Sequence, residues 1–267
     1  MTRQHLQTVP AAKTEEKIFP ICGAAPCAPD NTLLERFDAQ FEAVPANTPE
    51  RVRTAQRIRH QVYCVEHPYE TSDRPDGLET DAFDAHAAQS LLIHRASDAA
   101  LGTVRMILPL AHDLERSFAV QEVLDAESTK TFDQLPLHTM AEVSRFSISK
   151  KIRGKATTPD ATDDGQASVS GPLMRLGLIQ ALVQMSRAHG ITHWCAAMEP
   201  TLLRMLSAMA IRFVPVGPLV EHHGLRQPCY CVIADVLEAV KRERPAFWSV
   251  LTEAGALVSQ GRGVTLH

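Results

Sequence analysis

The chain has 267 residues, of which 45% are hydrophobic, so it can bury a full core, and we expect one domain rather than two. Its formal net charge of -4 argues against a nucleic-acid-binding protein, which usually carries a basic stripe. No apolar run approaches the roughly eighteen residues that a membrane helix requires. The N-terminus lacks a basic segment followed by a long apolar one, so we expect a cytoplasmic protein without a secretory signal.

Six cysteines are present, and their spacing matches no zinc-binding pattern. Cys229 and Cys231 flank a tyrosine in an apolar strand and point to one side of it, as small core residues do. In a cytoplasmic chain we interpret all six as reduced thiols. No cysteine has a histidine and an acid nearby in the arrangement of a cysteine nucleophile. We therefore predict neither a metal site nor cysteine-based catalysis.

The N-terminal third begins with a segment that lacks periodicity. Residues 1–30 are rich in Ala, Pro and Thr, and we predict a flexible arm there, followed by a single domain over 31–267. Residues 48–50 (TPE) are typical of a helix start, with a Thr cap and Pro in the first turn. The helical spacing of apolar residues then continues to about Glu66 and places Arg59 near the border of the buried face.

The rest of the chain alternates between strands and helices. We expect a long acidic loop over 67–87, a hairpin of 91–94 with 101–108, a helical segment 118–124 within an insertion, and a disordered polar segment 155–170. The later elements are predicted as helix 172–190, strand 191–197, helix 201–209, strand 212–216, strand 229–234 and a C-terminal helical extension 235–253 broken by Pro245. This order predicts an α/β fold with a mixed sheet covered on both faces.

Residues 140–154 (MAEVSRFSISKKIRG) form the most informative stretch. Apolar β-forming residues alternate there with polar ones, which predicts a strand that carries ionisable groups. Glu142 and Arg145 stand three positions apart, so on a regular strand they point to opposite faces and need separate partners. From this pattern alone, an edge strand with solvated charges is the simpler interpretation.

The run Glu142-Val143-Ser144-Arg145-Phe146 resembles the central strand of the acyl-homoserine-lactone (autoinducer) synthases and of the long-chain N-acyl amino acid synthases. Further segments resemble these families in the same order, namely 59–63 (RHQVY), 79–84 (ETDAFD) and 102–109 (GTVRMILP). Segments 76–81 and 217–228 resemble the acyltransferases that accompany exosortase/PEP-CTERM systems. The resemblance spans about 37–235. It implies the GNAT fold, a three-layer αβα sandwich around a mixed, mostly antiparallel sheet.

The resemblance also implies a set of site residues. Two central strands would part to receive an acyl thioester, with Glu142 as general base and with Ser144, Arg145 and Phe146 completing the catalytic strand. The residues implied at the substrate are Arg59, Tyr63, Asp81, Asp84, Arg105 and Ile148. Of these, Arg105 is the candidate for binding an amino acid carboxylate. Alternatively, the carboxylates and guanidiniums neutralise one another and only hold the acidic loop in place.

The donor is suggested by the end of the same stretch. Residues 151–156 (KIRGKA) are close to the GNAT coenzyme A loop, [RQ]-x-x-G-x-[GA], but Lys replaces the first position and a polar insertion separates the loop from the next helix. An acyl carrier protein needs no pyrophosphate cradle and is acidic. The basic residues that we predict to dock it are Lys150, Lys151, Arg153, Lys155 and Arg175, with a solvated surface as the alternative.

The acceptor is suggested by two departures from the autoinducer synthases. Tyr69 stands where those enzymes place a Trp for S-adenosylmethionine, and the chain is longer than theirs, which favours an amino acid acceptor. His222 and His223 are expected in a hairpin before Gly224. They can line the site, but adjacent residues on a strand face opposite ways and cannot share a metal.

We therefore predict an N-acyltransferase that uses an acyl-phosphopantetheine thioester of acyl carrier protein, with no tightly bound cofactor, to acylate the amino group of an amino acid. The alternatives are an acyl-homoserine-lactone synthase that consumes S-adenosylmethionine and a non-catalytic acyl-chain sensor.

Overall fold

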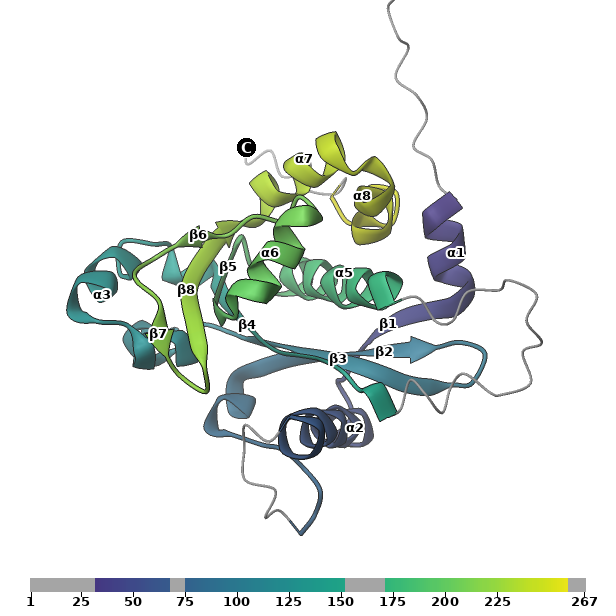
Figure 1. Ribbon diagram of the computed structural model, residues 1–267, viewed down its shortest axis with the longest axis horizontal. Coiled ribbons are helices and arrows are strands. Elements are labelled where there is room, and N and C mark those ends of the chain that lie inside the picture. The colour runs from purple at the N-terminus through teal and green to yellow at the C-terminus, as the bar shows by residue number, and fades with distance from the viewer. Residues whose placement is uncertain (1–31, 68–74, 152–170, 259–267) are drawn as a thin grey trace, which may run out of the picture.

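The computed structural model describes residues 32–67, 75–151 and 171–258. These residues form a mixed sheet with helices on both faces (Figure 1). The strands are β1 (Phe41–Pro45), β2 (Ala87–His94), β3 (Ala99–Ile107), β4 (Met140–Ile148), β5 (His193–Met198), β6 (Val214–Pro215), β7 (Val220–Glu221) and β8 (Leu225–Val232). Their spatial order is β1-β2-β3-β4-β5-β8-β6, and β7 also pairs with β8. The predicted arm 1–30, the segment 155–170 and the residues Tyr69, Arg153 and Lys155 lie outside the described residues.

The pairing of the strands is antiparallel at every step except one. Only β4 and β5, among the described strands, run parallel. Strands β1 to β4 thus form one antiparallel half of the sheet, and β5, β8 and β6 form the other half. The predicted mixed, mostly antiparallel sheet is confirmed, and the β4–β5 junction is where its two halves meet.

Helices cover the two faces unequally (Figure 1). The larger set consists of α1 (Thr32–Gln40), α5 (Gly171–His189), α6 (Pro200–Ala208), α7 (Ile233–Glu243) and α8 (Pro245–Thr252). Helix α5 is predominantly apolar, and twelve of its residues are buried between the sheet and α8. Helix α2 (Pro49–His60) covers the opposite face, over β2, β3 and β4. The break at Pro245 and the helices on either side of it agree with the prediction.

Helix α2 begins as the sequence predicts and ends in a wider turn. The hydroxyl of Thr48 accepts a hydrogen bond from the backbone N–H of Arg51 at 3.4 Å, and Pro occupies the first turn. The chain then continues as the π-helix η1 (Gln61–Glu66), so the helical segment does reach Glu66. Arg59 is wrongly predicted at the border of the buried face, because its side chain is fully buried.

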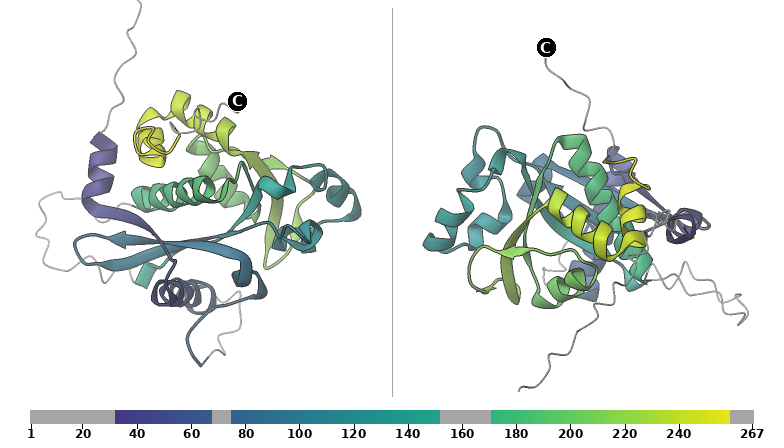
Figure 2. Two further views of the ribbon diagram at one scale, coloured as in Figure 1. Left: turned by 180° about the vertical axis from the view of Figure 1, so that it is seen from behind. Right: turned by 90° about the horizontal axis from the view of Figure 1, so that it is seen from above.

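The insertion between β3 and β4 packs as a small layer of its own. It contains the 3₁₀ turns η3 (Leu114–Arg116), η4 (Ala119–Val123) and η5 (Leu137–Thr139) and the helix α3 (Ala126–Phe132). Phe118 and Phe132 meet edge to face at 6.3 Å and form a second core with residues of β4 and β5. The insertion lies at the opposite end of the sheet from α1 in both side views (Figure 2). It fixes η4 beside the first residues of β4.

Strand β8 differs from its predicted bounds. It begins at Leu225, where its first residues pair with β7, and it ends at Val232 because α7 starts at the next residue. The turn between β7 and β8 contains Gly224 at a φ of 93°, a conformation that glycine adopts without strain. The hairpin predicted around His222 and His223 is therefore confirmed.

Candidate active site

The candidate site lies where β4 and β5 part. The two strands pair only from Met140 to Glu142 on β4, opposite His193 to Cys195 on β5. Beyond that point β4 continues along β3, and β5 continues along β8 to Met198. A cavity of about 490 Å³ lies there, and its walls come from both strands and from α5 and α6.

Strand β4 carries a bulge beside this cavity. Ser144 pairs with Arg105 and Ser147 pairs with Thr103, so β4 has one more residue between these pairs than β3 has. Arg145 occupies the bulge with a φ of 50°, which is uncommon for a residue other than glycine. The bulge interrupts the alternation of side chains. The prediction that Glu142 and Arg145 face opposite ways is therefore wrong, since both line the cavity.

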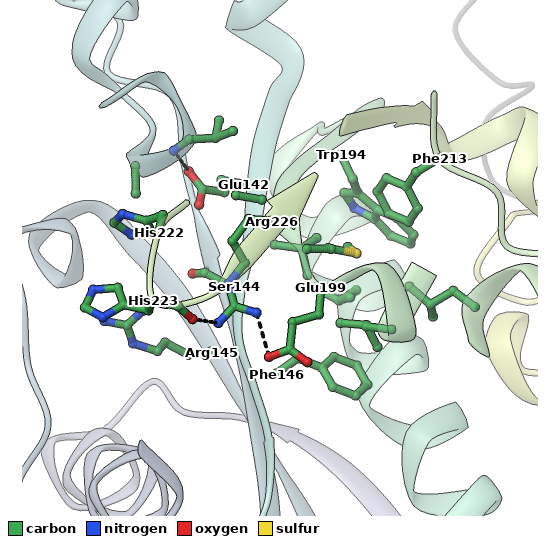
Figure 3. A pocket seen from close by; sticks show the side chains of 18 of the residues that line it. Glu142, Ser144, Arg145, Phe146, Trp194, Glu199, Phe213, His222, His223 and Arg226 are labelled. Atoms are coloured by element: carbon green, nitrogen blue, oxygen red, sulfur yellow. Dashed lines mark hydrogen bonds and ion pairs between the residues drawn. The ribbon is translucent and has the colours of Figure 1, made fainter. Parts of the chain in front are cut away.

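Glu142 is a buried carboxyl group in the cavity wall. Its side chain is 5% exposed, and Oε2 accepts a hydrogen bond from the backbone N–H of Val120 on η4 at 2.8 Å (Figure 3). Burial raises the pKa of Glu142 to about 7, against the opposing effects of the Val120 N–H and of the positive charges of Arg105 and Arg145. A carboxyl with this pKa exchanges protons readily near neutral pH, as a general base must.

A network of six charged side chains lies next to the bulge, and we call it the charged cluster. Its members are Arg59, Glu79, Asp81, Asp84, Arg105 and Arg145. Arg59 contacts Glu79 and also reaches Asp84 at 2.6 Å. Arg105 reaches Asp81 at 2.6 Å, and Arg145 reaches Glu79 at 2.9 Å. Each guanidinium thus bridges two carboxylates, which ties α2, β3 and β4 to the loop that carries the acids.

The position of the charged cluster shows which of its residues can contact a substrate in the cavity. Of its members, Arg145 lines the cavity, and Arg59, Asp81, Asp84 and Arg105 are absent from the wall that the described residues form. Arg105 also donates from Nε to the hydroxyl of Ser144 at 3.0 Å, and its side chain is 1% exposed. This placement argues against Arg105 as the group that receives an amino acid carboxylate. It favours the alternative that the network orders the loop and the bulge.

Acid is expected to unfold the protein through the charged cluster. Burial alone would raise the pKa of Glu79, Asp81 and Asp84, but their guanidinium partners outweigh it, and the pKa of each is lowered. A lowered folded-state pKa contributes stability that is present above the unfolded pKa and is lost as the pH falls through the folded pKa. The melting temperature should therefore drop steeply below about pH 4. Asp81→Asn should make this drop shallower, and an unchanged slope would contradict the assignment.

One side of the cavity is apolar. Its wall there is formed by Val143, Ile179, Leu182, Trp194, Leu206, Ile211 and Phe213. Trp194 donates from Nε1 to the hydroxyl of Ser186 at 2.8 Å, so its only polar atom is bonded and the ring presents an apolar surface. Figure 3 shows Trp194 and Phe213 together on this side of the cavity.

The opposite side of the cavity is polar. Arg145 lies 5.3 Å above the ring of Tyr63, and both side chains line the cavity. His222 and His223 meet edge to face at 4.7 Å, and both line it as well. The prediction that they face opposite ways is wrong because they belong to the turn, where His223 has a φ of 51°. Arg226 joins them from β8.

Comparisons with known proteins agree with this architecture. Residues 58–159 match the family model of an acetyltransferase (GNAT) domain. Over these residues the chain is similar to a GNAT domain. The match begins in the last turn of α2 and covers the charged cluster, the bulged strand β4 and Glu142, which are the parts of the chain that the sequence motifs single out.

Solved structures that are similar to this chain include the following three. TofI in a ternary complex with an inhibitor and MTA has 18% identity and a TM-score of 0.52, over 78% of this chain and 99% of that chain. FeeM, an N-acyl amino acid synthase from uncultured soil microbes, has 14% identity and a TM-score of 0.51, over 75% and 94%. The CoA-dependent acyl-homoserine lactone synthase BjaI, with SAM and isopentyl-CoA, has 19% identity and a TM-score of 0.51, over 76% and 88%. At these identities the likeness shows the fold, and the predicted GNAT fold is confirmed.

The residues predicted to dock a carrier protein lie partly within the described residues. Lys150 and Lys151 are exposed, and Arg175 is half-buried near the start of α5. The backbone N–H groups of Lys150 and Lys151 donate to the carboxylate of Glu66, at 3.0 and 3.2 Å. Of the two, Lys151 belongs to the segment 151–156 that resembles a pyrophosphate loop, and the rest of that segment lies outside the described residues. An anion of the protein itself, Glu66, therefore occupies both N–H groups.

The described residues offer little support for cysteine-based or metal-based catalysis. Cys195 is buried, and burial raises the pKa of its thiol, which disfavours the thiolate form that a nucleophile requires. No group of three His, Cys, Asp or Glu side chains within 32–67, 75–151 and 171–258 is arranged to hold a metal ion. Across the same residues, every helix is too short or too polar to cross a lipid bilayer.

Several residues of the site are absent from the set of site residues predicted from the sequence. Glu79 completes the charged cluster, and Glu199 and Arg226 meet across the cavity at 2.6 Å (Figure 3). Glu199 precedes α6 and Arg226 lies on β8, so only the folded sheet brings them to the residues of β4. The match of 79–84 to the acidic motif includes Glu79, and this is the one signal that points to a member of the cluster beyond those named.

Proposed function

We propose that this GNAT domain is an N-acyltransferase that transfers a long-chain acyl group from acyl carrier protein to the amino group of an amino acid. One observation carries the proposal. A single cavity joins Glu142, a buried carboxyl with a pKa of about 7, to an apolar chamber between parted strands. Such a cavity offers a fatty chain a dry site and offers an amine a base at the same place.

The reaction needs one proton acceptor and one oxyanion site. Glu142 takes a proton from the acceptor ammonium, the neutral nitrogen forms a bond to the thioester carbonyl carbon, and the carbon–sulfur bond then breaks. The departing thiolate takes up a proton as the amide forms. Beyond Glu142, the β5-facing edge of β4 has left the β4–β5 ladder, so backbone N–H groups near Phe146 and Ile148 are the candidates for stabilising the oxyanion.

The identity of the acyl donor is the more specific part of the proposal. Glu66 accepts a hydrogen bond from the backbone N–H of Lys151, the first residue of the segment that resembles a pyrophosphate loop, and also from that of Lys150, which precedes it. A phosphopantetheine arm needs no pyrophosphate cradle, and the exposed ammonium groups of Lys150 and Lys151 suit an acidic carrier protein. This supports acyl carrier protein over acyl-CoA as donor. The cytoplasmic location stays a prediction.

The proposal is tested by supplying the purified protein with long-chain acyl carrier protein and the twenty amino acids. Mass spectrometry should detect an N-acyl amino acid, formed more slowly when acyl-CoA replaces the carrier protein. Release of methylthioadenosine from added S-adenosylmethionine, with a lactone product, would instead establish the autoinducer synthase alternative. Tight binding of the acyl group without product from any amine would establish the sensor.

The acyl-chain length that the enzyme prefers should depend on the side chains of the apolar wall. Leu206 is buried on α6 and lines the cavity, so Leu206→Phe should shorten the chamber and shift the preferred acyl group to one with fewer carbons. Each methylene that no longer fits costs about 0.8 kcal/mol, which is roughly fourfold in selectivity. Leu203→Phe on the same helix is the control, since Leu203 does not line the cavity. Equal chain preference in the two variants would contradict this placement.

A further inference from the structure

We infer that Arg226 binds the carboxylate of the acceptor amino acid, and that Glu199 holds this guanidinium until the acceptor arrives. The inference rests on the proposed function, since it names the residue that recognises the acceptor. It assigns a role to two side chains that are not among the predicted site residues.

Arg226 projects from β8 into the cavity. Its Nη2 donates to the backbone carbonyl of His223 at 2.7 Å, and its Nη1 contacts Oε1 of Glu199 at 2.6 Å. Figure 3 shows this pair between the two histidines on one side and Trp194 with Phe213 on the other. The guanidinium therefore lies where the polar part of the cavity meets the apolar part, which is where an amino acid about to be acylated has to lie.

The other arginines near the site are held by acids that are less exposed than Glu199. Arg59 and Arg105 have side chains at most 1% exposed and contact the carboxylates of the charged cluster. Arg145 lines the cavity, but it contacts Glu79, whose side chain is 1% exposed and has no solvent to move into. Separating any of these pairs would leave a buried charge without its partner, which is strongly unfavourable. None of the three is a suitable site for an exchangeable carboxylate.

The Arg226–Glu199 pair differs in the exposure of its acid. The side chain of Glu199 is 46% exposed, whereas that of Arg226 is 14% exposed. Such a half-exposed carboxylate can turn into water at little cost, because exposed ion pairs contribute little to stability. Glu199 also stands at the N-cap of α6, where the helix dipole favours a negative charge whether or not it contacts Arg226. An incoming carboxylate can therefore replace it on the guanidinium.

The distribution of charge fits an α-amino acid. Its ammonium and its carboxylate stand on one carbon, so the base and the cation that recognise them must face one cavity, as Glu142 and Arg226 do. Glu142 accepts the proton of the ammonium, and a guanidinium binds a carboxylate through two parallel hydrogen bonds. The acceptor class is therefore an amino acid with a free α-carboxylate.

The test compares each amino acid with its α-carboxamide, which keeps the side chain and the amine and loses the negative charge. For the best acceptor, the carboxamide should show a KM roughly 10 to 100 times higher with wild-type enzyme, the loss expected for a hydrogen bond to a charged group. Arg226→Gln should raise the KM of the amino acid to a similar value while the KM of the acyl donor stays unchanged. Arg226→Lys should restore part of the difference, and Glu199→Gln should lower the KM of the amino acid.

Three results would overturn the inference. One is a wild-type enzyme that acylates the carboxamide as efficiently as the amino acid, a result that does not depend on how any variant folds. Another is an equal fall in kcat for both acceptors in Arg226→Gln, which would assign Arg226 to the thioester carbonyl. The third is a rise in the KM of the amino acid in Glu199→Gln, which would make Glu199 itself the binding group.

A binding measurement separates this inference from the proposed function. Millimolar amino acid should raise the melting temperature of the wild type and leave that of Arg226→Gln unchanged, and this readout requires no turnover. Stabilisation without any acylated product would refute the proposed transfer and support Arg226 as the carboxylate site. Product formation with equal stabilisation of wild type and variant would refute the role of Arg226 alone.

Discussion

Glu142→Gln is expected to reduce the turnover of acyl transfer about 100-fold at pH 8, the effect of removing a general base. Glutamine keeps the shape of the side chain and an oxygen that can accept the hydrogen bond from Val120, but it cannot take up a proton. Turnover is measured with saturating donor and acceptor, so that a change in binding does not enter. Glu122→Gln is the control, because Glu122 is an exposed carboxylate on the same 3₁₀ turn as Val120.

Glu142→Gln is also expected to change the stability of the protein. The pKa of Glu142 is raised from 4.5 to about 7 in the folded protein, so its contribution to stability is fully present below about pH 4.5 and is lost as the pH rises towards 7. Glu142→Gln removes this loss, and at pH 8 the variant should melt at a higher temperature than the wild type. A variant that is inactive and also less stable would indicate damage to the fold instead of loss of a base.

Glu79→Ala is expected to destabilise the protein by about 3–5 kcal/mol, the range for removing one partner of a buried ion pair. The side chain of Glu79 is 1% exposed and contacts both Arg59 and Arg145, so its loss leaves two guanidiniums in a poorly solvated place. Because Arg145 sits in the bulge of β4, activity should fall together with stability. Urea unfolding at pH 7 measures the change in the free energy of unfolding.

The control for Glu79→Ala is an ion pair on the surface. Glu127 contacts Lys130 at 3.3 Å, and both side chains are exposed. Glu127→Ala should leave the unfolding midpoint essentially unchanged, as is usual for an exposed pair within one helix. If the two variants unfold at similar urea concentrations, the charged cluster does not brace the bulge and the loop as we describe.

The sequence contains clear signals for the elements that local rules determine. The Thr cap and Pro at the start of α2, the β-forming residues of β4 and the apolar residues of α5 each lie in a short segment, and the three elements that they predict are confirmed. Glu142 could be placed in the central strand because its motif and the strand pattern coincide. Its burial and its hydrogen bond to Val120 depend on the insertion, which local patterns do not position.

Residues that the sequence places wrongly share a physical reason. The bulge at Arg145 has no local signal, because glycine or asparagine is the usual marker of a left-handed conformation and arginine is not. The turn at His223 reverses the side chains in the same way. Arg105 is the predicted candidate for binding the acceptor carboxylate, but its guanidinium already contacts Asp81 and Asp84 of the acidic loop. Glu199 and Arg226 meet only through the pairing of β5 with β8.

The pH dependence of kcat/KM for acyl transfer, compared between the wild type and Glu142→Gln, tests the central claim most directly. The claim predicts that the wild-type rate rises with pH through an inflection near 7, where Glu142 loses its proton, and that this inflection is absent from the variant. A wild-type profile without an inflection near 7, or a variant that keeps one, would show that another group accepts the proton.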